Sequence, residues 1–203
     1  MKIGLAAALR PGAELWQVPP GQETRDERGS TLPLSPIRSR SDVQAIVGYL
    51  VSQAQQRLGF DPGDVLDASK VVSELCYNVV DHSQAEGLAV AQILRDRQGQ
   101  RYISLAVVDA GVGIRASLAG RHPAAAQGRH GEAIQRALGG LSSRSSGGGA
   151  GLRSIHAVVR RYGGRLAIRS GDERLAVSAE RQSRTLAGAW FPGAQVGISF
   201  SQR

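Results

Sequence analysis

The 203-residue sequence predicts an α+β domain, because stretches with helical periodicity are joined by short strand-like runs. Apolar residues recur at helical spacing at 43–58, 68–79 and 152–162, as in helices with one buried side. Runs rich in Val, Ile, Leu and Ala at 88–94 and 102–108 have the length of strands. A chain of this length has room for one sizeable domain with an appendage.

The composition excludes several kinds of protein. No apolar run approaches the roughly 20 residues that a membrane helix needs, so we expect no bilayer span. The apolar run at 3–9 is short for a signal peptide and precedes Arg10-Pro11-Gly12 without a convincing cleavage site, so we expect a cytoplasmic protein. Cys76 is the single cysteine, which rules out an internal disulfide.

The net charge of +8 comes mainly from arginine, since Lys2 and Lys70 are the two lysines. Such a surplus can attract nucleic acid, acidic proteins or phosphates. The arginines are scattered, aromatic residues make up 4% of the chain, and neither a basic helix nor a zinc-ligand spacing is present. Nucleic-acid binding is therefore not favoured.

Residues 1–30 are expected to form a flexible N-terminal extension, because they mix proline, glycine and charges without periodicity. Residues 31–203 then form the domain. The segment 31–37 predicts a short edge strand that two prolines interrupt. Ser41-Asp42-Val43-Gln44 has the form of a capping box, so the first helix should begin there and end at Gly59.

A second helix is predicted to begin at Asp61-Pro62, which supplies an N-cap acid and a proline at the first helical position. Glu74, Asn78 and Asp81 should project together beside its apolar stripe, because positions i, i+4 and i+7 stack on one side of a helix. That placement suits the floor of a pocket, although a partly exposed amphipathic helix gives the same pattern. The apolar stripe consists of Ala68, Val72, Leu75 and Val79.

The second half of the chain begins with a predicted hairpin of 88–94 and 102–108, followed by Asp109-Ala110-Gly111-Val112-Gly113. Residues 115–149 are rich in Gly, Ser, Ala and Arg and predict a long functional loop with one helical piece at 131–138. A helix should then begin near Leu152 and stop at Gly163-Gly164. Four strands are expected after it, at 165–169, 176–179, 185–190 and 196–200.

Three separated segments together resemble the GHKL superfamily of ATP-binding proteins. The family's N box is similar to the helix segment from Glu74 to His82, and its G1 box to Asp109-Ala110-Gly111-Val112-Gly113. Its G2 box is similar to Gly147-Gly148-Gly149-Ala150-Gly151-Leu152, and the three occur in the family's order. The resemblance implies an α+β two-layer sandwich, with a mixed, mainly antiparallel sheet, helices on one face and an ATP lid at about 115–149.

The resemblance also implies roles for these residues. Asn78 would be the metal ligand, because one amide oxygen can join the nucleotide phosphates around Mg²⁺. Glu74 is the candidate general base, and Asp109 would accept a hydrogen bond from the exocyclic amine of adenine. Glycines let the backbone approach the ring and the phosphates. The other candidate ATP contacts are Asp81, Gly111, Gly113, Gly147, Gly148, Gly149, Gly151 and Leu152.

Within the superfamily, the sequence looks like the stand-alone anti-sigma-factor serine kinases of bacteria, which bind ATP and often phosphorylate a STAS-domain antagonist. The segments that carry this likeness are Leu32-Pro33, Leu58-Gly59-Phe60 and Val72-Ser73-Glu74-Leu75. The implied partner is a STAS-domain protein or a sigma factor, and a homodimer is compatible with the sequence. Two departures leave the partner open: the segment 171–192 is long and adds a hairpin, and Ala194 stands where related sequences often carry threonine.

Two other functions stay open. The protein could be an ATP-dependent module that binds a protein partner with little turnover. It could also be the catalytic domain of a histidine kinase, although the helix at 41–58 contains no histidine. That second alternative requires a phosphoacceptor in trans.

Overall fold

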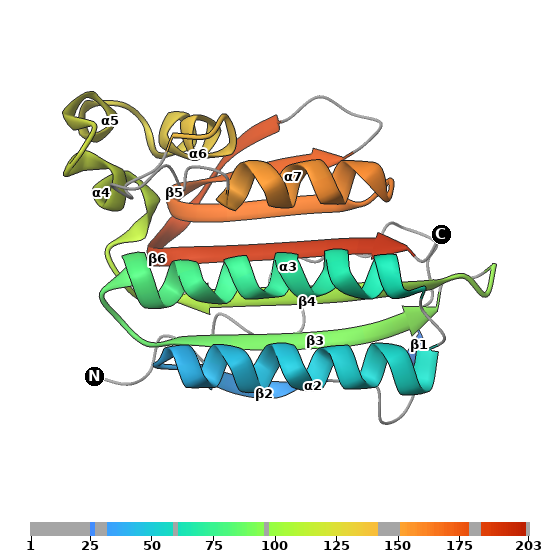
Figure 1. Cartoon of the computed structure of the whole chain (residues 1–203). Helices are drawn as coiled ribbons and strands as arrows, with labels where there is room; N and C mark the ends of the chain where they lie inside the picture. The colour runs from blue at the N-terminus through green and yellow to red at the C-terminus, as the bar shows by residue number, and fades with distance from the viewer. Residues whose placement is uncertain are drawn as a thin grey trace.

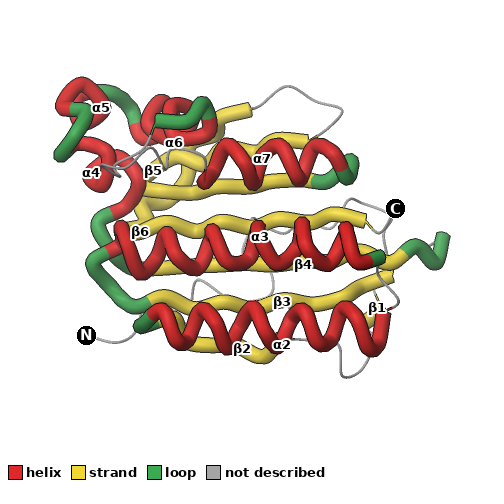
Figure 2. Tube along the Cα trace, viewed as in Figure 1, coloured by secondary structure: helices red, strands yellow, loops and turns green. Residues whose placement is uncertain are grey.

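The structure is a computed structural model that describes residues 25–26, 32–58, 61–95, 98–141, 151–178 and 184–201. At its centre is a six-stranded sheet with strand order β1-β3-β4-β6-β5, and β2 pairs with β3 beside β1. Every pairing between the described strands is antiparallel. Helices α2, α3 and α7 lie over one face of the sheet (Figure 1, Figure 2). The predicted α+β fold with a mainly antiparallel sheet is confirmed.

Two short strands form one edge of the sheet. β2 (Leu32–Ile37) is the predicted short strand; it pairs with β3 (Gly87–Arg95), and its register shifts between Leu32 and Ser35, where Pro33 lies. Proline lacks the N–H of a ladder donor, so it is tolerated at such an irregular edge. β1 (Arg25–Asp26) pairs with the other end of β3, so these two residues of the expected extension are in a strand. The remainder of 1–31 lies outside the described residues, and the domain boundary stays a prediction.

Helix α2 (Arg40–Leu58) begins earlier than predicted and has a different cap. The predicted capping box between Ser41 and Gln44 is wrong. Instead, the Asp42 N–H donates to Ser39 Oγ at 3.3 Å, and the Ser39 N–H donates to Asp42 Oδ2 at 3.0 Å. This is the reciprocal bonding of a capping box with aspartate at the third helical position. The Arg38 amide and the Ser39 hydroxyl also donate to Asp42 and lower its pKa.

Helix α3 (Pro62–Asn78) begins where the sequence predicts, with Pro62 at its first position. Asp61 has extended backbone angles, but its side chain makes no cap hydrogen bond, so the proline and the first-turn acid Asp64 supply the N-terminal signal. The chain then continues as η2 (Val79–Ser83), a π-helical turn that periodicity does not predict.

The sheet is completed by two hairpins. β4 (Arg101–Asp109) pairs with β3 along its whole length, which confirms the predicted hairpin. β5 (Arg165–Ser178) and β6 (Arg184–Ser201) form the second hairpin. The four segments predicted as strands lie in these two wherever they are described, but their division into four strands is wrong because β5 and β6 are continuous. Register shifts on both sides of Gly171 bend the hairpin where the sequence suggested that strands end.

The expected loop at 115–149 is partly helical. Its described part holds α4 (Gly113–Ala119), α5 (Pro123–Gln127) and the predicted α6 (His130–Leu138). The first two are too short to show helical periodicity in the sequence. Residues 142–150 lie outside the described residues.

Helix α7 (Gly151–Arg161) follows the lid segment and ends as predicted at Gly163-Gly164. Gly163 has a φ of 62°, a left-handed conformation that favours glycine at a helix C-terminus.

The main core lies between the sheet and helices α2, α3 and α7, and the predicted stripe residues Val72, Leu75 and Val79 are buried in it. A second, smaller cluster of Leu118, Ala133 and Ala137 joins α4 to α6. The helices thus bury one side each. None of the helices within the described ranges is long and apolar enough to cross a membrane.

Candidate functional site

One open cavity lies where α3, η2 and α7 meet the ends of β4 and β6, and α4 and α6 form its opposite wall. Its volume is about 820 Å³ with the open mouth included. The polar lining comes from Glu74, Asn78, His82, Ser83, Asp109 and Ser117. Most of the remaining lining is apolar, from Leu75, Val79, Val107, Ile114, Leu118, Ala137, Leu141, Leu152, Ala194 and Val196.

The floor of the cavity is formed by α3 and η2. Glu74 and Asn78 line it from successive turns of α3, as helical spacing predicts. His82 lines it as well, whereas Asp81 does not. A π-turn closes i→i+5 hydrogen bonds, so its backbone rotates less per residue than that of an α-helix. His82 therefore lies on the same side as Asn78, and Asp81 lies away from the cavity.

Asp81 contacts helix α2 instead of the cavity. Its Oδ1 accepts a hydrogen bond from Arg40 Nη2 at 2.8 Å. The Arg40 guanidinium also lies 5.1 Å from the centroid of the Tyr77 ring. The expected common flank therefore holds for Glu74 and Asn78 and is wrong for Asp81.

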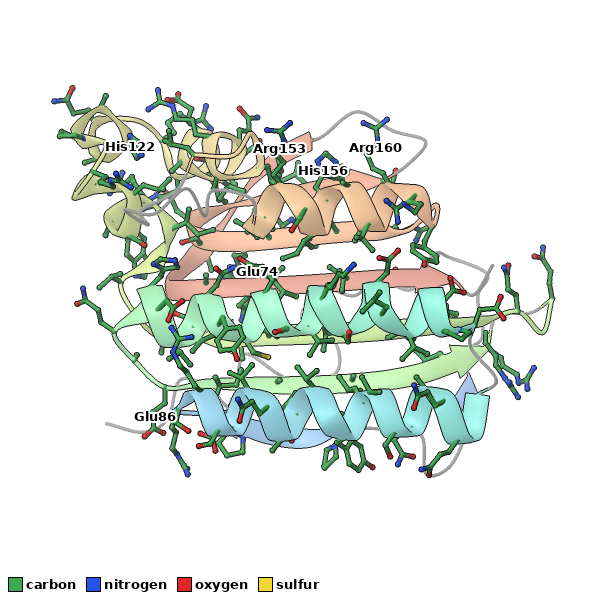
Figure 3. The ribbon with its side chains drawn as sticks, in the orientation of Figure 1. Glu74, Glu86, His122, Arg153, His156 and Arg160 are labelled. Atoms are coloured by element: carbon green, nitrogen blue, oxygen red, sulfur yellow. The ribbon has the colours of Figure 1, made fainter. Side chains whose placement is uncertain are left out.

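Glu74 lies against the first residue of α7. A Cβ on Gly151 would overlap the Glu74 carboxylate, so the absence of a side chain at Gly151 lets the two helices approach here. Figure 3 shows Glu74 on the side of α3 that faces α7. At the other end of this helix pair, the Tyr162 hydroxyl donates to Asp64 Oδ1 at 2.7 Å. The two helices are thus antiparallel and are joined at both ends.

Asp109 is the buried acid of the site, with 7% of its surface exposed. Its Oδ1 accepts the Gly111 N–H at 2.9 Å, and the Ala194 backbone N–H donates to the same carboxylate. Burial raises the pKa of Asp109, and these two amide donors oppose that shift. A buried carboxylate at the end of a strand can accept a hydrogen bond from a polar ligand that enters the cavity.

The turn after Asp109 is packed between two backbones. A Cβ on Gly111 would overlap the Ser83 carbonyl, and a Cβ on Gly193 would overlap the Asp109 carbonyl. Gly113 has a φ of 76° and lines the cavity. Both conformation and space therefore require glycine in this turn.

The cavity brings together six of the predicted site residues: Glu74, Asn78, Asp109, Gly113, Gly151 and Leu152. Gly111 lies behind its wall and supports the turn. Gly147, Gly148 and Gly149 lie outside the described residues. The roles of these residues in binding and catalysis stay predictions.

Ser170 is a site residue that sequence reasoning missed. It is 1% exposed, accepts the Ile114 N–H at 3.0 Å and donates to the Gly193 carbonyl at 2.9 Å, so it joins α4 to β6. Its signal is a polar residue at an inward position of β5, two residues after the buried Ile168. Ser117, Leu118, Ala137 and Leu141 were missed because only the packing of the lid helices brings them to the cavity.

A nucleotide and its metal ion require particular oxygen ligands and hydrogen-bond acceptors from the protein. No group of three or more His, Cys, Asp or Glu side chains in the described part of the chain could hold a metal ion by itself. An amide oxygen from Asn78 is a hard ligand of the kind that Mg²⁺ shares with phosphates and water. Apolar walls around one buried carboxylate fit a flat heterocycle with an amine donor. The residues present therefore fit ATP with Mg²⁺.

Comparison with known proteins agrees with this geometry. The family of histidine kinase-, DNA gyrase B- and HSP90-like ATPases matches residues 63–191. This segment includes the six predicted residues that line the cavity, from Glu74 to Leu152. No curated protein sequence gives a significant match. The chain belongs to this GHKL family of ATPase domains, and ATP binding is the activity that membership implies.

Proposed function

We propose that the protein is a Mg-ATP-binding regulatory kinase of the anti-sigma type that phosphorylates serine or threonine on a STAS-domain-like partner. One observation carries the proposal: Glu74 and Asn78 line, from successive turns of α3, the same cavity as the buried Asp109. A carboxylate, an amide and a buried acceptor then serve three different needs of phosphoryl transfer from ATP.

The bound nucleotide would be held at two ends. At the base end, the buried Asp109 would accept a hydrogen bond from the amine of adenine, and Gly113 lines the cavity close by in the chain. At the metal, the Asn78 amide oxygen supplies one ligand to Mg²⁺. ATP supplies the phosphoryl group, and these side chains bind and orient it.

Glu74 has the position of a general base. It lines the cavity one turn before Asn78, so it can accept the proton of a serine or threonine hydroxyl that enters from a partner. The Glu74 carboxylate lies against Gly151, and a residue with a side chain at that position would collide with it.

The same contact favours a second candidate function. The Glu74 carboxylate lies against Gly151 at the start of α7, so packing occupies the side chain that a kinase needs as its base. With Glu74 held there, the protein would act as an ATP-dependent binding module with little turnover. A histidine-kinase domain acting in trans is less well supported, since α2 carries no histidine.

The experiment that tests the proposal measures ATP binding and phosphate transfer in two variants. Asn78→Ala should abolish Mg²⁺-dependent ATP binding, because the metal loses its protein ligand. Glu74→Ala should retain ATP affinity and lose at least about a hundredfold in transfer, the usual contribution of a general base. Labelled ATP and a purified STAS-domain protein provide the transfer assay.

Glu86→Ala is the matched control, because Glu86 is an exposed carboxylate outside the cavity that pairs with Arg38 (Figure 3). It should behave as wild type in both assays. Wild-type ATP affinity in Asn78→Ala would overturn the nucleotide-site assignment. ATP binding without transfer by the wild type would favour the binding module over the kinase.

A further inference from the structure

The β5–β6 hairpin continues beyond the rest of the sheet. Pairing between β4 and β6 ends at Val108 and Gln195, whereas β5 and β6 remain paired as far as Ala176 and Arg184. We call the part made of 171–178 and 184–192 the hairpin extension. Helix α6 packs against it at the end of the molecule that carries the cavity (Figure 1).

A buried carboxylate of the extension contacts the N-terminus of α6. The Glu173 side chain is 5% exposed, and its Oε2 accepts the Gly131 N–H at 2.6 Å. Its Oε1 accepts a hydrogen bond from the Arg129 guanidinium. A helix N-terminus has unpaired N–H groups and a partial positive charge, so this carboxylate satisfies one donor and stabilises the helix end.

Two glycines let the surfaces approach each other. A Cβ on Gly131 would lie 3.1 Å from Glu173 Oε2, and a Cβ on Gly171 would overlap the His130 ring. His130 Nδ1 also lies 2.7 Å from Asp172 Oδ1, and its ring stands edge-on to Trp190 at a centroid distance of 5.2 Å. The first residues of α6 are thus held against the extension by several contacts.

The other end of α6 forms part of the cavity wall. Ala137 lines the cavity and packs with Leu118 of α4 in the small cluster, against which Leu141 and Leu152 also pack. A nine-residue helix moves as a rigid rod, so a shift at its N-terminus changes the wall at its C-terminus. Ile134 and Leu138 of α6 are also buried in the main core, so apolar packing holds the middle of this helix and Glu173 holds its N-terminus.

We propose that Glu173 is a positioning residue for the nucleotide site: by fixing the N-terminus of α6 to the hairpin extension, it holds the lid-side wall in the geometry that binds ATP. This inference rests on the proposed ATP site. The family resemblance leaves the hairpin extension without a role. In this inference the extension fixes the lid wall from within the same chain.

The test compares Glu173→Ala and Glu173→Gln with wild type in two measurements. In hydrogen exchange without nucleotide, the amides of residues 131–138 should exchange faster in Glu173→Ala, while those of α3 keep wild-type rates. In equilibrium binding with Mg-ATP, the Kd should rise about tenfold, as expected if α6 takes the binding geometry about a tenth of the time. Glu173→Gln keeps an acceptor for Gly131 and should give smaller changes in both.

Glu86→Gln is the matched control, because Glu86 is an exposed carboxylate that pairs with Arg38 and belongs neither to α6 nor to the hairpin extension. It should leave both measurements unchanged. Unchanged exchange of the α6 amides in Glu173→Ala would overturn the inference, and so would faster exchange with a wild-type Kd. If Glu173→Ala does not fold, the same two outcomes in Glu173→Gln decide. Failure of the wild type to bind ATP would instead overturn the proposed function.

Discussion

The two walls of the cavity are built in different ways. The floor wall, made by α3, η2 and the turn after β4, belongs to the main core and is fixed by backbone packed on backbone at Gly111 and Gly193. The lid wall, made by α4 and α6, packs through Ile134 and Leu138 of the core and a small separate cluster, and side-chain hydrogen bonds to Glu173 fix the N-terminus of α6. The floor is therefore held by its backbone, whereas the N-terminal end of the lid wall is held by side chains.

This difference matches what the two walls would do in a nucleotide-binding protein. A site for a flat base needs a rigid acceptor, and Asp109 is held by two backbone amides. A wall next to the open mouth must let ligand enter, and the N-terminus of α6 in that wall is held by side-chain hydrogen bonds at Glu173. The following predictions test the contrast, from the largest expected effect to the smallest.

The largest effect is expected for Gly111→Ala in the floor wall. Its Cβ would overlap the Ser83 carbonyl, and neither backbone can shift without disturbing η2 or β4. We expect a loss of about 3 kcal/mol or more in the free energy of unfolding, measured with urea. Gly120→Ala is the control on the lid side, because no atom lies within 4 Å of a Cβ there. A stable Gly111→Ala protein with normal ATP affinity would contradict the rigid floor.

Tyr162→Phe tests how α7 is fixed to the floor. The Tyr162 hydroxyl donates to the buried Asp64 and lies 3.2 Å from Asp67 Oδ2, and burial is the main reason why its pKa is raised. Removing it leaves a buried carboxylate without this donor, so we expect a loss of about 1–3 kcal/mol in unfolding free energy. Tyr49→Phe on the exposed side of α2 should change it by less than about 0.5 kcal/mol. Equal effects in the two variants would argue against the buried contact.

The floor wall and the lid wall also differ in how far the sequence predicts them. Glu74 and Asn78 follow from helical spacing, and Asp109 with Gly113 from a turn after a strand, because each signal lies within a few neighbouring residues. The lid wall depends on Glu173, which is 42 positions from its partner Gly131, and no local pattern joins them. The π-turn at Val79–Ser83 was missed for a related reason, since its i→i+5 bonds have no distinct sequence period.

The strands show the same limit. The β3–β4 hairpin was predicted because each strand is a run rich in apolar residues, whereas polar residues around Gly171 divide β5 into two apparent strands. In the structure those polar residues are the ones that contact the lid, since Asp172 and Glu173 pair with His130 and Arg129. A segment that serves a tertiary contact loses the alternation that would reveal it as a strand.

The pKa values of Asp109 and Asp172 are shifted in opposite directions, so their contributions to stability should depend on pH with opposite sign. Burial raises the pKa of Asp109 above its ordinary 3.8, so the folded state holds this proton more tightly than the unfolded state. Its contribution to stability is therefore present below pH 3.8 and is lost as the pH rises through the raised value. Asp109→Asn should remove that loss of stability, and should weaken ATP binding about tenfold at neutral pH because a charged acceptor is lost.

Asp172 gives the opposite sign and is the matched control. Its hydrogen bond from His130 is the main cause that lowers its pKa below 3.8, so its contribution is present above that pH and is lost on acidification. Asp172→Asn should remove the loss of stability that this carboxyl group causes as the pH falls. Urea unfolding at a series of pH values measures both slopes, and slopes of the same sign in the two variants would contradict this assignment.

The smallest effect is expected at Asp81, where sequence and structure disagree. The sequence groups Asp81 with Glu74 and Asn78, but the π-turn turns it toward Arg40, whose side chain is 65% exposed. An exposed ion pair contributes about 0.2–1 kcal/mol, so Asp81→Asn should cost no more than that and should change the Kd for ATP less than about threefold. A double-mutant cycle with Arg40→Ala measures the pair itself, because Arg40→Ala should remove the effect of Asp81→Asn on stability. If Asp81→Asn instead weakened ATP binding as strongly as Asn78→Ala, Asp81 would face the ligand and the floor would rearrange on binding, which its backbone-on-backbone packing opposes.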